Sequence, residues 1–286
     1  MRILITGSSG RVGAAIAARL VEWHEVIGID VVPGQWTCHL ADVTDRTLMF
    51  QLAREVDAIV HTASLHHPHL ATHSEQDFIA TNVTGTLNLL EAATQAGVRR
   101  FVYTSTTSLY GHAMHSRRKA VWVTEDLKPR QRDIYDYTKI LAENLCRRFA
   151  MTNKLSAICL RIARCFPQEP HLLALYRLYR GVDVRDVAVA HELALTNRDM
   201  QFGIFNIAAQ SPFRESDAPL LLHDAPAVLR ERMPEALSIF ARHNWPLPQS
   251  IDRVYVIEAA QRHLGYQPVY NFKAYIQELE EAQASC

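Results

Sequence analysis

The sequence predicts an α/β fold in which helices cover both faces of a doubly wound parallel sheet. Short runs of branched apolar residues, typical of buried strands, recur along the first 160 residues. Amphipathic helical stretches separate these runs, and a glycine-rich turn joins the first run to the first helix. Because strands that alternate with helices pair in parallel, this order predicts a parallel, doubly wound sheet.

The expected elements follow one another regularly up to about residue 160. We expect six strands, at residues 2–6, 25–30, 37–40, 57–61, 100–104 and 155–160. We expect four helices, at residues 14–22, 46–55, 78–95 and 134–151. Gly97 follows the third helix, as expected of a glycine that ends a helix in the left-handed conformation.

The pattern changes after Pro167. We expect, in order, a helix from about residue 182 to 195, a strand at 202–207, one or two helices within 212–248, and a helix at 252–264 closed by Gly265. We therefore divide the chain into a first domain, residues 1–167, and a remainder, residues 168–286. The remainder would add the final elements of the sheet and a small C-terminal lobe.

Composition and charge exclude several classes of function. The chain has 286 residues, with 30 Lys and Arg against 30 Asp and Glu, so its formal net charge is zero. A neutral chain has no general attraction for nucleic acid or an anionic membrane, and we expect neither as a partner. No apolar run is long enough to span a bilayer, and a strand that begins at residue 2 leaves no room for a signal peptide.

The cysteines indicate the compartment. They are odd in number, scattered, and without the spacing of a metal site: Cys38, Cys146, Cys159, Cys165 and Cys286. Free thiols of this kind are typical of a reducing environment, so we expect a cytoplasmic protein.

The first thirty residues have the layout of a dinucleotide-binding βαβ unit in a Rossmann-type fold. Gly7 permits a sharp turn after the strand, and Gly10 lets a pyrophosphate approach the backbone. Gly13 lets the helix pack closely on the sheet. The N–H groups around Arg11 and Val12, at the start of the helix, would face the phosphates.

Asp30 determines the expected choice of cofactor. It ends the second strand, where a carboxylate accepts hydrogen bonds from both ribose hydroxyls. The same charge repels a 2′-phosphate, and no Lys or Arg follows through Trp36, so we expect NAD rather than NADP.

Two further strand ends are candidates for cofactor contact. Asp42, which is followed by Val43, is placed to bind the adenine amino group. Alternatively, it belongs to the capping region of the next helix, with Thr44 or Asp45 as the cap. Ala63 lies among small residues that permit close approach of a flat cofactor.

A loop after the fourth strand contains four histidines within residues 66–73. Neither a Cys nor a pair of carboxylates accompanies them, and Pro68 breaks the helix that would align them. We expect no metal and read the segment as a polar loop at the rim of the sheet, where one histidine could contact substrate.

Tyr135 and Lys139 suggest acid/base chemistry. They are four residues apart on an expected helix and therefore share a face. A nearby ammonium and the positive charge of oxidised nicotinamide would lower the pKa of the phenol, which would then exchange a proton with a substrate alcohol or ketone. Lys139 would also orient the nicotinamide ribose, and Ser105 or Thr106 would hold the substrate oxygen.

At this point the chain resembles the extended short-chain dehydrogenase/reductases of the NAD-dependent epimerase/dehydratase type. The motifs that carry the resemblance are Thr6–Gly13, Asp30, Asp42–Val43, Asn82–Thr86, Phe101–Gly111, Tyr135 with Lys139, Val182–Ala188 and Leu264–Pro268. The resemblance implies that Tyr135 is the acid/base, Lys139 its partner and Thr106 the catalytic hydroxyl. It also implies NAD held across the strand ends, with Asn82 in the cofactor site, and a homodimer formed by the helices at 78–95 and 134–151.

Two departures from the family pattern bear on the substrate. Family members that act on nucleotide sugars have an Asn after the sixth strand, where this chain has Arg164. The long insertion that builds their nucleotide pocket is reduced to about a dozen residues between Pro167 and Val182. Uronate dehydrogenases are similar in this compact arrangement. Arg164 would hold a carboxylate or phosphate, or else is a solvated or structural arginine.

The expected function is hydride transfer between NAD and a secondary alcohol or ketone of a small sugar-like or sugar-acid substrate, bound by the C-terminal lobe. One alternative is a nucleotide-sugar epimerase or dehydratase that retains its NAD. A second, non-enzymatic alternative is an NAD-sensing protein, which would have no need for Tyr135, Lys139 and Thr106 together.

Overall fold

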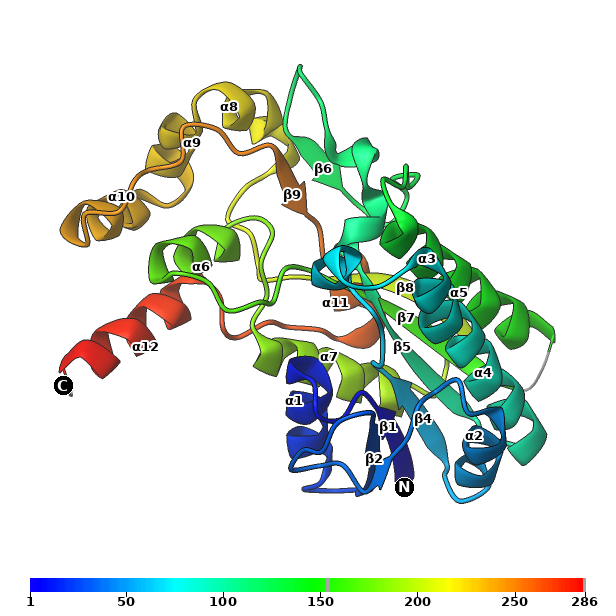
Figure 1. Cartoon of the computed structure of the whole chain (residues 1–286). Coiled ribbons are helices and arrows are strands. Elements are labelled where there is room, and N and C mark those ends of the chain that lie inside the picture. Colours follow the sequence, from blue (N-terminus) through cyan, green and yellow to red (C-terminus); the bar gives the residue numbers. More distant parts are fainter. Residues whose placement is uncertain (153–154, 285–286) are drawn as a thin grey trace. The chain divides into compact units, whose positions relative to one another are not determined.

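The computed structural model describes residues 1–152 and 155–284, and Figure 1 shows the course of the chain. Cys286, one of the five cysteines, lies outside the described residues. The chain forms two compact units: the first contains Met1–Leu109, Gln131–Arg161 and Val187–Phe205, and the second contains Tyr110–Arg130, Ile162–Asp186 and Asn206–Cys286. The domain boundary at residue 167 stays a prediction.

Seven strands form the main sheet. In sheet order they are β3 (His39–Leu40), β2 (Glu25–Asp30), β1 (Arg2–Thr6), β4 (Ala58–His61), β5 (Arg100–Thr106), β7 (Ser156–Ile162) and β8 (Phe202–Ile207). Pairing is parallel from β3 to β5. The order changes direction between β1 and β4, so the doubly wound, Rossmann-type sheet is confirmed. All seven predicted strands are present, and β5 extends two residues beyond its predicted end, to Thr106.

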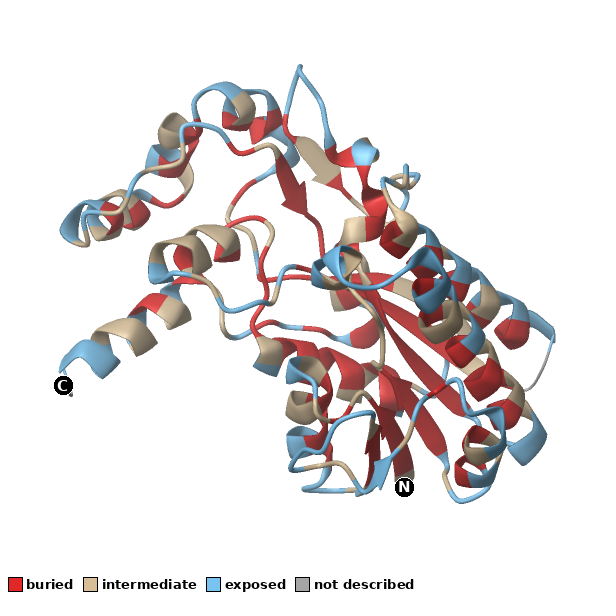
Figure 2. Ribbon diagram, in the orientation of Figure 1, coloured by how far each residue is buried: buried red, intermediate tan, exposed pale blue. Residues whose placement is uncertain are grey.

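Helices cover both faces of this sheet, and Figure 2 shows the buried layer between them. One face carries α2 (Arg46–Ala53), α4 (Gly85–Ala96) and α5 (Ile134–Thr152), whose apolar residues form one core with the strands. The other face carries α1 (Arg11–Leu20) and α7 (Val184–Thr196), which an ion pair of 2.6 Å between Arg19 and Glu192 joins. Ile3 and Ile5 of β1 alternate with Leu4, and all three are fully buried, as a strand covered on both sides requires.

The helix predicted at residues 78–95 is longer and is not uniform. It consists of α3 (Glu75–Ile79), a π-helical turn (Ala80–Thr84) and α4. Ser74 caps its start by accepting the N–H of Asp77, and Gly97, at φ 76°, ends it as predicted. A π turn inserts one residue into the helix and is frequent at functional sites.

The second unit departs more from prediction. The proline-rich stretch forms three helices where one or two were expected: α8 (Ala218–His223), α9 (Ala225–Arg232) and α10 (Pro234–Arg242). The helix predicted from residue 252 begins later, as α11 (Glu258–Leu264), because Arg253–Tyr255 forms strand β9, which pairs in parallel with β6 (Val121–Val123). Gly265 closes α11 at φ 71°, as predicted.

Two helices of the second unit had no counterpart in the prediction, α6 (Pro170–Arg177) and α12 (Phe272–Ala284). Their buried residues Ala174, Phe272 and Ile276 join the core of this unit, in which Phe240 stacks on Phe272 at 6.3 Å. Short 3-10 turns complete the chain at His67–Ala71, Thr107–Tyr110, His112–Met114 and Glu215–Asp217. Among the described residues, none of the helices has both the length and the apolar character to cross a bilayer.

Candidate active site

The loop between β1 and α1 can accept a phosphate against its backbone. Gly7 has φ +72°, a conformation that favours glycine. A Cβ on Gly13 would lie 2.0 Å from the Gly7 carbonyl oxygen, so the helix can approach the loop only with glycine there. Gly10 caps α1 without a side-chain bond to its N–H groups, and a Cβ there would meet only the Gly7 oxygen, at 3.3 Å. The N–H groups at Arg11 and Val12 therefore begin a helix with open space before them, which fits a pyrophosphate.

Asp30 lies against this loop. Its Oδ2 accepts the Ser9 N–H at 2.9 Å, and its Oδ1 accepts the Val32 N–H at 3.3 Å. The carboxylate is thus held at the end of β2, next to the place where the phosphates would bind. This position fits a ribose hydroxyl contact, and that role of Asp30 stays a prediction.

Asp42 and its neighbours form a local turn. Asp42 Oδ1 accepts both the N–H and the hydroxyl of Thr44, each at 2.8 Å, whereas Asp45 caps α2 by accepting the Leu48 N–H at 3.0 Å. Of the two caps considered, Asp45 is therefore the one used. Val43 is buried, and a Cβ on Gly85 would lie 2.4 Å from its Cγ2, which explains the glycine at the start of α4. The adenine contact of Asp42 stays a prediction.

Asn82 joins three elements around the end of β4. It lies on the π turn, and its Oδ1 accepts the Leu65 N–H at 2.8 Å and the Ser64 hydroxyl at 3.2 Å. Its Nδ2 donates to the Leu65 carbonyl at 2.9 Å and to Thr138 Oγ1 at 3.0 Å. Asn82 therefore holds the loop that follows Ala63 against α5. Its partner on α5 is Thr138, the residue before Lys139. The Ala63 N–H itself bonds to Thr6 Oγ1 at 3.1 Å.

Lys139 is buried among neutral groups. Its Nζ donates to the Thr104 carbonyl at 2.8 Å, lies 3.5 Å from Ser64 Oγ, and sits 4.3 Å from the centre of the Tyr103 ring. Burial lowers the pKa of Lys139 to about 7. The negative charge of Glu143, one turn further along α5, acts in the opposite direction and raises that pKa. Lys139 can therefore gain or lose a proton near neutral pH.

Tyr135 is buried one turn before Lys139, and Thr106 is its hydrogen-bond partner. Burial raises the pKa of the Tyr135 phenol, the Thr106 hydroxyl lowers it, and the charges of Asp136 and Asp133 raise it. The sequence led us to expect a lowered pKa under the joint influence of Lys139 and oxidised nicotinamide. In the chain alone, burial dominates, so the phenol is protonated, and the lowering by the cofactor stays a prediction.

Ser105 and Thr106 have different partners. Ser105 Oγ donates to Glu143 Oε1 at 2.6 Å, and Glu143 forms a buried ion pair of 2.7 Å with Arg161. The Ser105 hydroxyl is thereby held by Glu143, whereas the Thr106 hydroxyl meets the phenol. Of the two residues predicted to hold the substrate oxygen, the geometry favours Thr106.

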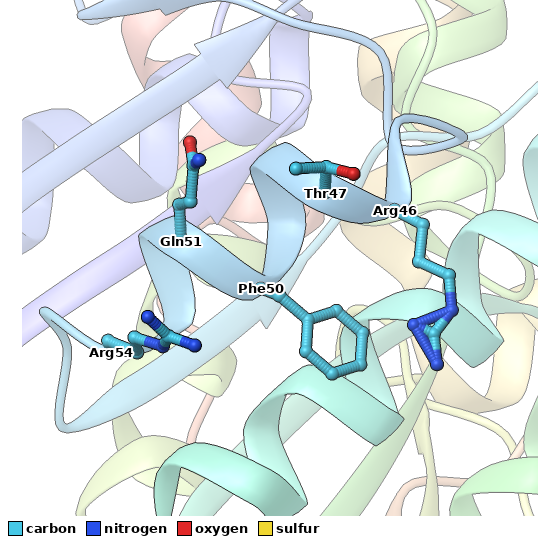
Figure 3. Close-up of a pocket in the computed structure, with 5 residues that line it drawn as sticks. All are labelled: Arg46, Thr47, Phe50, Gln51 and Arg54. Atoms are coloured by element: carbon cyan, nitrogen blue, oxygen red, sulfur yellow. The ribbon is translucent and has the colours of Figure 1, made fainter.

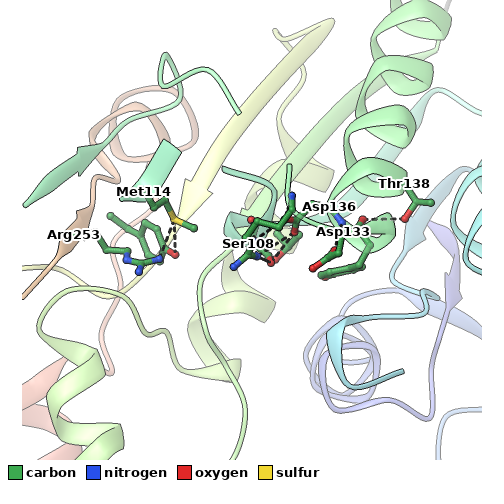
Figure 4. A network of polar contacts seen from close by, with 10 residues as sticks. Ser108, Met114, Asp133, Asp136, Thr138 and Arg253 are labelled. Carbon is green, nitrogen blue, oxygen red and sulfur yellow. Dashed lines mark hydrogen bonds and ion pairs between the residues drawn. The ribbon is translucent and has the colours of Figure 1, made fainter. Parts of the chain in front are cut away.

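Sequence reasoning missed a polar cluster that adjoins Tyr135, drawn in Figure 4. Asp136 is fully buried, accepts the Ser108 hydroxyl at 2.9 Å and pairs with Arg132 at 2.9 Å. Sequence spacing gave little sign of this cluster, because Arg132 precedes the start of α5 at Ile134 and Ser108 is distant in sequence.

Arg164 belongs to the second unit and is exposed. Its guanidinium lies 5.8 Å from the Phe166 ring and 5.6 Å from the Tyr176 ring, and that of Arg180 lies 4.1 Å from the same Tyr176 ring. Arg180 is a second cation that the sequence analysis did not single out. The substrate contact of Arg164 stays a prediction.

The histidine loop forms a compact turn. His66, His69 and His73 stack edge to face, with ring centres 4.3 and 5.2 Å apart, and burial lowers the pKa values of His66 and His69. In the part of the chain that the structure describes, no cluster of three or more His, Cys, Asp or Glu residues could hold a metal ion.

A shallow hollow lies on α2, away from the residues predicted for the site. Figure 3 shows its lining, which consists of Arg46, Thr47, Phe50, Gln51 and Arg54. All five residues come from α2 and the residue after it, and Arg46 also contacts Glu91 at 2.9 Å. None of them is a predicted site residue.

Comparison with known proteins agrees with this geometry. Residues 3–171 match the model of the NAD dependent epimerase/dehydratase family. A 3-beta-hydroxysteroid dehydrogenase from Mycolicibacterium neoaurum is 34% identical over 155 residues, which is 50% of this chain and 41% of that protein. A uronate dehydrogenase from Pseudomonas putida is 26% identical over 182 residues, 60% of this chain and 63% of that protein. The match thus spans less than two thirds of either relative.

Solved structures share the fold along the whole chain. A short-chain dehydrogenase/reductase superfamily protein from Agrobacterium tumefaciens, crystallised with bound NAD, has a TM-score of 0.75 at 23% identity and covers 100% of this chain and 98% of its own. MoeE5 in complex with UDP-glucose and NAD has a TM-score of 0.72 at 22% identity, with coverages of 100% and 99%. At this level of identity the likeness establishes the fold.

Proposed function

Because the chain belongs to the NAD dependent epimerase/dehydratase family, we propose that it is an NAD-dependent oxidoreductase. It would move a hydride between NAD and a secondary alcohol or ketone of a sugar or sugar-acid substrate. The single observation that carries the proposal is the trio in the first unit, in which Tyr135 meets the Thr106 hydroxyl one helical turn from Lys139.

The residues that would hold NAD follow from the first unit. The glycine loop would bind the pyrophosphate through backbone N–H groups, and Asp30 would accept the hydroxyls of the adenosine ribose. Lys139 would donate to the nicotinamide ribose from its position between Thr104 and Ser64. NAD would supply the hydride acceptor and, when oxidised, a positive charge. Asp42 with Val43, Ala63 and Asn82 would complete the cofactor site.

Tyr135 would then act as the acid/base. In substrate oxidation its phenolate takes the hydroxyl proton, and in reduction the phenol returns a proton to the carbonyl oxygen. Thr106 would hold the same substrate oxygen by a hydrogen bond, so that proton transfer needs no rearrangement. Lys139 would favour the phenolate by its charge, to an extent that depends on pH because its own pKa is about 7.

The substrate is proposed to be small and acidic. The support is Arg164, whose exposed guanidinium lies near the Phe166 and Tyr176 rings. An exposed guanidinium is suited to bind a carboxylate or phosphate. The stretch before Val182 is filled by the short helix α6, which leaves little chain to build a nucleotide pocket. A relative named uronate dehydrogenase supports the same class of substrate.

A nucleotide-sugar epimerase or dehydratase is the second candidate. A UDP-glucose 4-epimerase from Streptomyces lividans is among the relatives, 28% identical over 169 residues, 55% of this chain and 50% of that protein. Such an enzyme would return the hydride to its substrate and would keep its NAD bound. An NAD-sensing protein is the non-enzymatic alternative, and it would bind NAD tightly without turnover.

The cofactor state of the purified protein separates these candidates. The protein is denatured and the supernatant is assayed for NAD and NADH. NAD in near-stoichiometric amount favours the epimerase or dehydratase, whereas an empty protein that binds NAD reversibly favours the dehydrogenase. Failure to bind NAD at all contradicts the proposal.

Turnover is then followed at the NADH absorbance with D-glucuronate, D-galacturonate, UDP-glucose and a 3β-hydroxysteroid. Oxidation of a uronate supports the proposed substrate class. Oxidation of the steroid alone contradicts it, and NAD binding without turnover of any of them favours the sensor.

A homodimer and a cytoplasmic location complete the proposal. Ile79 on α3 and Tyr137 and Leu141 on α5 expose 45, 54 and 48% of their surfaces, which leaves an apolar strip for a second copy. Cys38, Cys146 and Cys159 are free thiols, which supports the proposal of a reducing compartment.

A further inference from the structure

Asp136 is a buried carboxylate for which the proposed chemistry has no use. It follows Tyr135 on α5, and its side chain has no exposed surface. Burying a carboxylate is costly unless it is paired and hydrogen-bonded. The hydrogen-bond partners of Asp136 therefore indicate its role.

The partners form a closed triangle, of which Figure 4 labels Ser108 and Asp136. Ser108 Oγ donates to Asp136 Oδ1 at 2.9 Å, and Arg132 Nε donates to Asp136 Oδ2 at 2.9 Å. Arg132 Nη2 closes the triangle by donating to Ser108 Oγ at 2.6 Å. Three side chains from two segments are thus fixed relative to one another, since each one bonds to the other two.

The triangle reaches Thr106 through one backbone amide. The Ser108 N–H donates to Thr106 Oγ1 at 3.1 Å. This oxygen accepts a hydrogen bond from the Ser108 N–H, which leaves the hydroxyl hydrogen of Thr106 available for Tyr135, its side-chain hydrogen-bond partner. Asp136 is covalently next to Tyr135, so the chain of contacts begins and ends at neighbouring residues.

We propose that Asp136, together with Arg132 and Ser108, is a positioning residue that holds the Thr106 hydroxyl against the Tyr135 phenol. The proposal rests on the proposed function of Tyr135 as the acid/base. Asp136 acts through Ser108 and Thr106 and does not itself contact substrate. Its carboxylate provides two acceptor oxygens, one for the loop after β5 and one for the cation that neutralises it.

The charges around Tyr135 give this arrangement a measurable signature. Asp136 and Asp133, both on or just before α5, raise the pKa of the phenol, and Thr106, at the end of β5, lowers it. From α3, the Phe78 ring lies 6.5 Å away and carries no charge. Arg132 pairs with Asp136 and so reduces the effect of that carboxylate. Loss of Asp136 therefore has two opposing effects on the pKa of the phenol: loss of its charge lowers that pKa, and loss of the Thr106 hydrogen bond that it supports raises it.

The first test is a titration of the phenol in the holoprotein. The chain is labelled with 3-fluorotyrosine, and its 19F resonances are followed against pH at saturating NAD, with Tyr135→Phe to assign the signal. We expect Asp133→Asn, which removes only a like charge, to lower the pKa of the residue at position 135. We expect Asp136→Asn, which also releases the Thr106 hydroxyl, to leave that pKa higher than Asp133→Asn does. A pKa in Asp136→Asn that is equal to or lower than that in Asp133→Asn overturns the positioning role.

The second test separates position from charge. Asp133→Asn is the matched control, because it removes a like charge near Tyr135 and leaves the triangle intact. With whichever substrate of the panel the wild type turns over fastest, we expect Asp136→Asn and Ser108→Ala to lower kcat about tenfold with the Kd for NAD unchanged, as for lost orientation. We expect Asp133→Asn to retain kcat and Ser108→Thr, which keeps a hydroxyl, to recover most of it.

The outcomes separate this proposal from the proposed function. Equal kcat values for Asp136→Asn and Asp133→Asn, or no recovery in Ser108→Thr, overturn the positioning role. If Tyr135→Phe retains full activity, the proposed function fails and the positioning proposal fails with it. If Tyr135→Phe is inactive while Ser108→Ala and Asp136→Asn are unimpaired, only the positioning proposal fails.

Discussion

Asn82 Nδ2 donates to Thr138 Oγ1 at 3.0 Å, one residue before Lys139 on α5. The same amide bonds to both backbone polar groups of Leu65 in the loop after β4. Lys139 in turn donates to the carbonyl oxygen of Thr104 on β5. The lysine is therefore placed by contacts from three elements, and its ammonium is held beside the residues that follow β4 and β5. These contacts fix the position of the lysine through its neighbours, as an ordered site requires.

Tyr135→Phe tests the acid/base assignment. The change removes one hydroxyl from a buried ring, so we expect the fold and the Kd for NAD to be retained. Turnover should fall by about 10²- to 10⁴-fold, the usual contribution of a positioned proton donor. Steady-state kinetics and NAD titration measure both quantities. Tyr137→Phe is the matched control, because Tyr137 lies on the same helix and 54% of its surface is exposed. Equal activity of the two variants would place the acid/base elsewhere.

Asp30→Ala tests the ribose contact. Removal of a charged acceptor should weaken NAD binding by about ten- to a hundredfold. Because the carboxylate no longer repels the 2′-phosphate of NADP, the preference for NAD over NADP should decrease. Isothermal titration with each dinucleotide measures the ratio. Glu22→Ala, at an exposed acid after α1, should leave both affinities unchanged. An unaltered NAD/NADP ratio in Asp30→Ala would show that another residue reads the ribose.

Local spacing made these residues predictable from the sequence. Gly7, Gly13 and Asp30 lie within one βαβ unit, where contacts follow directly from residue separation. Tyr135 and Lys139 were found in the same way, since four residues make one helical turn. Residue spacing did not decide between Ser105 and Thr106, because adjacent strand residues point to opposite faces and only the fold shows which face carries Tyr135. The family resemblance implied Thr106, and the geometry favours the same residue.

The missed features depend on contacts between distant residues. Ser108 lies 28 positions before Asp136, and their contact exists only because β5 and α5 pack together. The pairing of Val121 with Arg253 joins two short strands with more than a hundred residues between them, and neither strand is long enough to show alternation. The π turn at Ala80–Thr84 inserts one residue into a helical pattern, which the periodicity of 3.6 does not resolve.

Arg164→Ala tests the anion contact. We expect KM for D-glucuronate to rise about tenfold or more, since a charge-assisted bidentate contact is lost, and KM for a neutral sugar to stay the same. Arg164→Lys should recover only part of the loss, because an ammonium cannot bond in bidentate fashion. Arg118→Ala, at another exposed arginine of the second unit, is the control. Equal changes in KM for charged and neutral substrates would contradict the anion contact.

Leu141→Glu tests the proposed dimer. Leu141 is 48% exposed on α5, one turn after the exposed Tyr137, so a charge there would be desolvated in an interface but solvated in a monomer. Light scattering after gel filtration should show the wild type as a dimer and Leu141→Glu as a monomer. Leu220→Glu, at an exposed leucine of the second unit, should leave the mass unchanged. A monomeric wild type would contradict the proposed assembly.

Two buried histidines predict how stability depends on pH. Burial lowers the pKa of His61 to about 3 and that of His191 to about 4. His191 Nδ1 lies 2.8 Å from the Val187 carbonyl, so it carries the proton, and Nε2 accepts from Thr104 Oγ1 at 2.7 Å. His61 is bonded to Thr6 and Thr86 at 2.7 and 2.9 Å. Both rings are therefore neutral in the fold, because burial disfavours the charged form.

The sign follows from proton uptake. The folded pKa values lie below the unfolded value of about 6.5, so between about pH 6.5 and pH 4 the unfolded chain binds more protons. The contribution of each histidine is fully present above pH 6.5 and is lost as the pH falls toward the folded pKa. We expect the free energy of unfolding to fall by about 2 kcal/mol per histidine between pH 7.5 and pH 5. Urea denaturation of the ligand-free protein at several pH values in this range measures the decline.

His191→Gln isolates one of the two contributions. The glutamine amide can keep a hydrogen bond to Thr104 but does not titrate, so the variant should lose about half of the pH dependence even where it is less stable overall. His115→Gln, at an exposed histidine, should retain the full decline. The free energy of unfolding of the wild type could instead stay constant from pH 7.5 to pH 5. The two rings would then accept protons within the fold, and the statement that they are buried in the neutral form would be wrong.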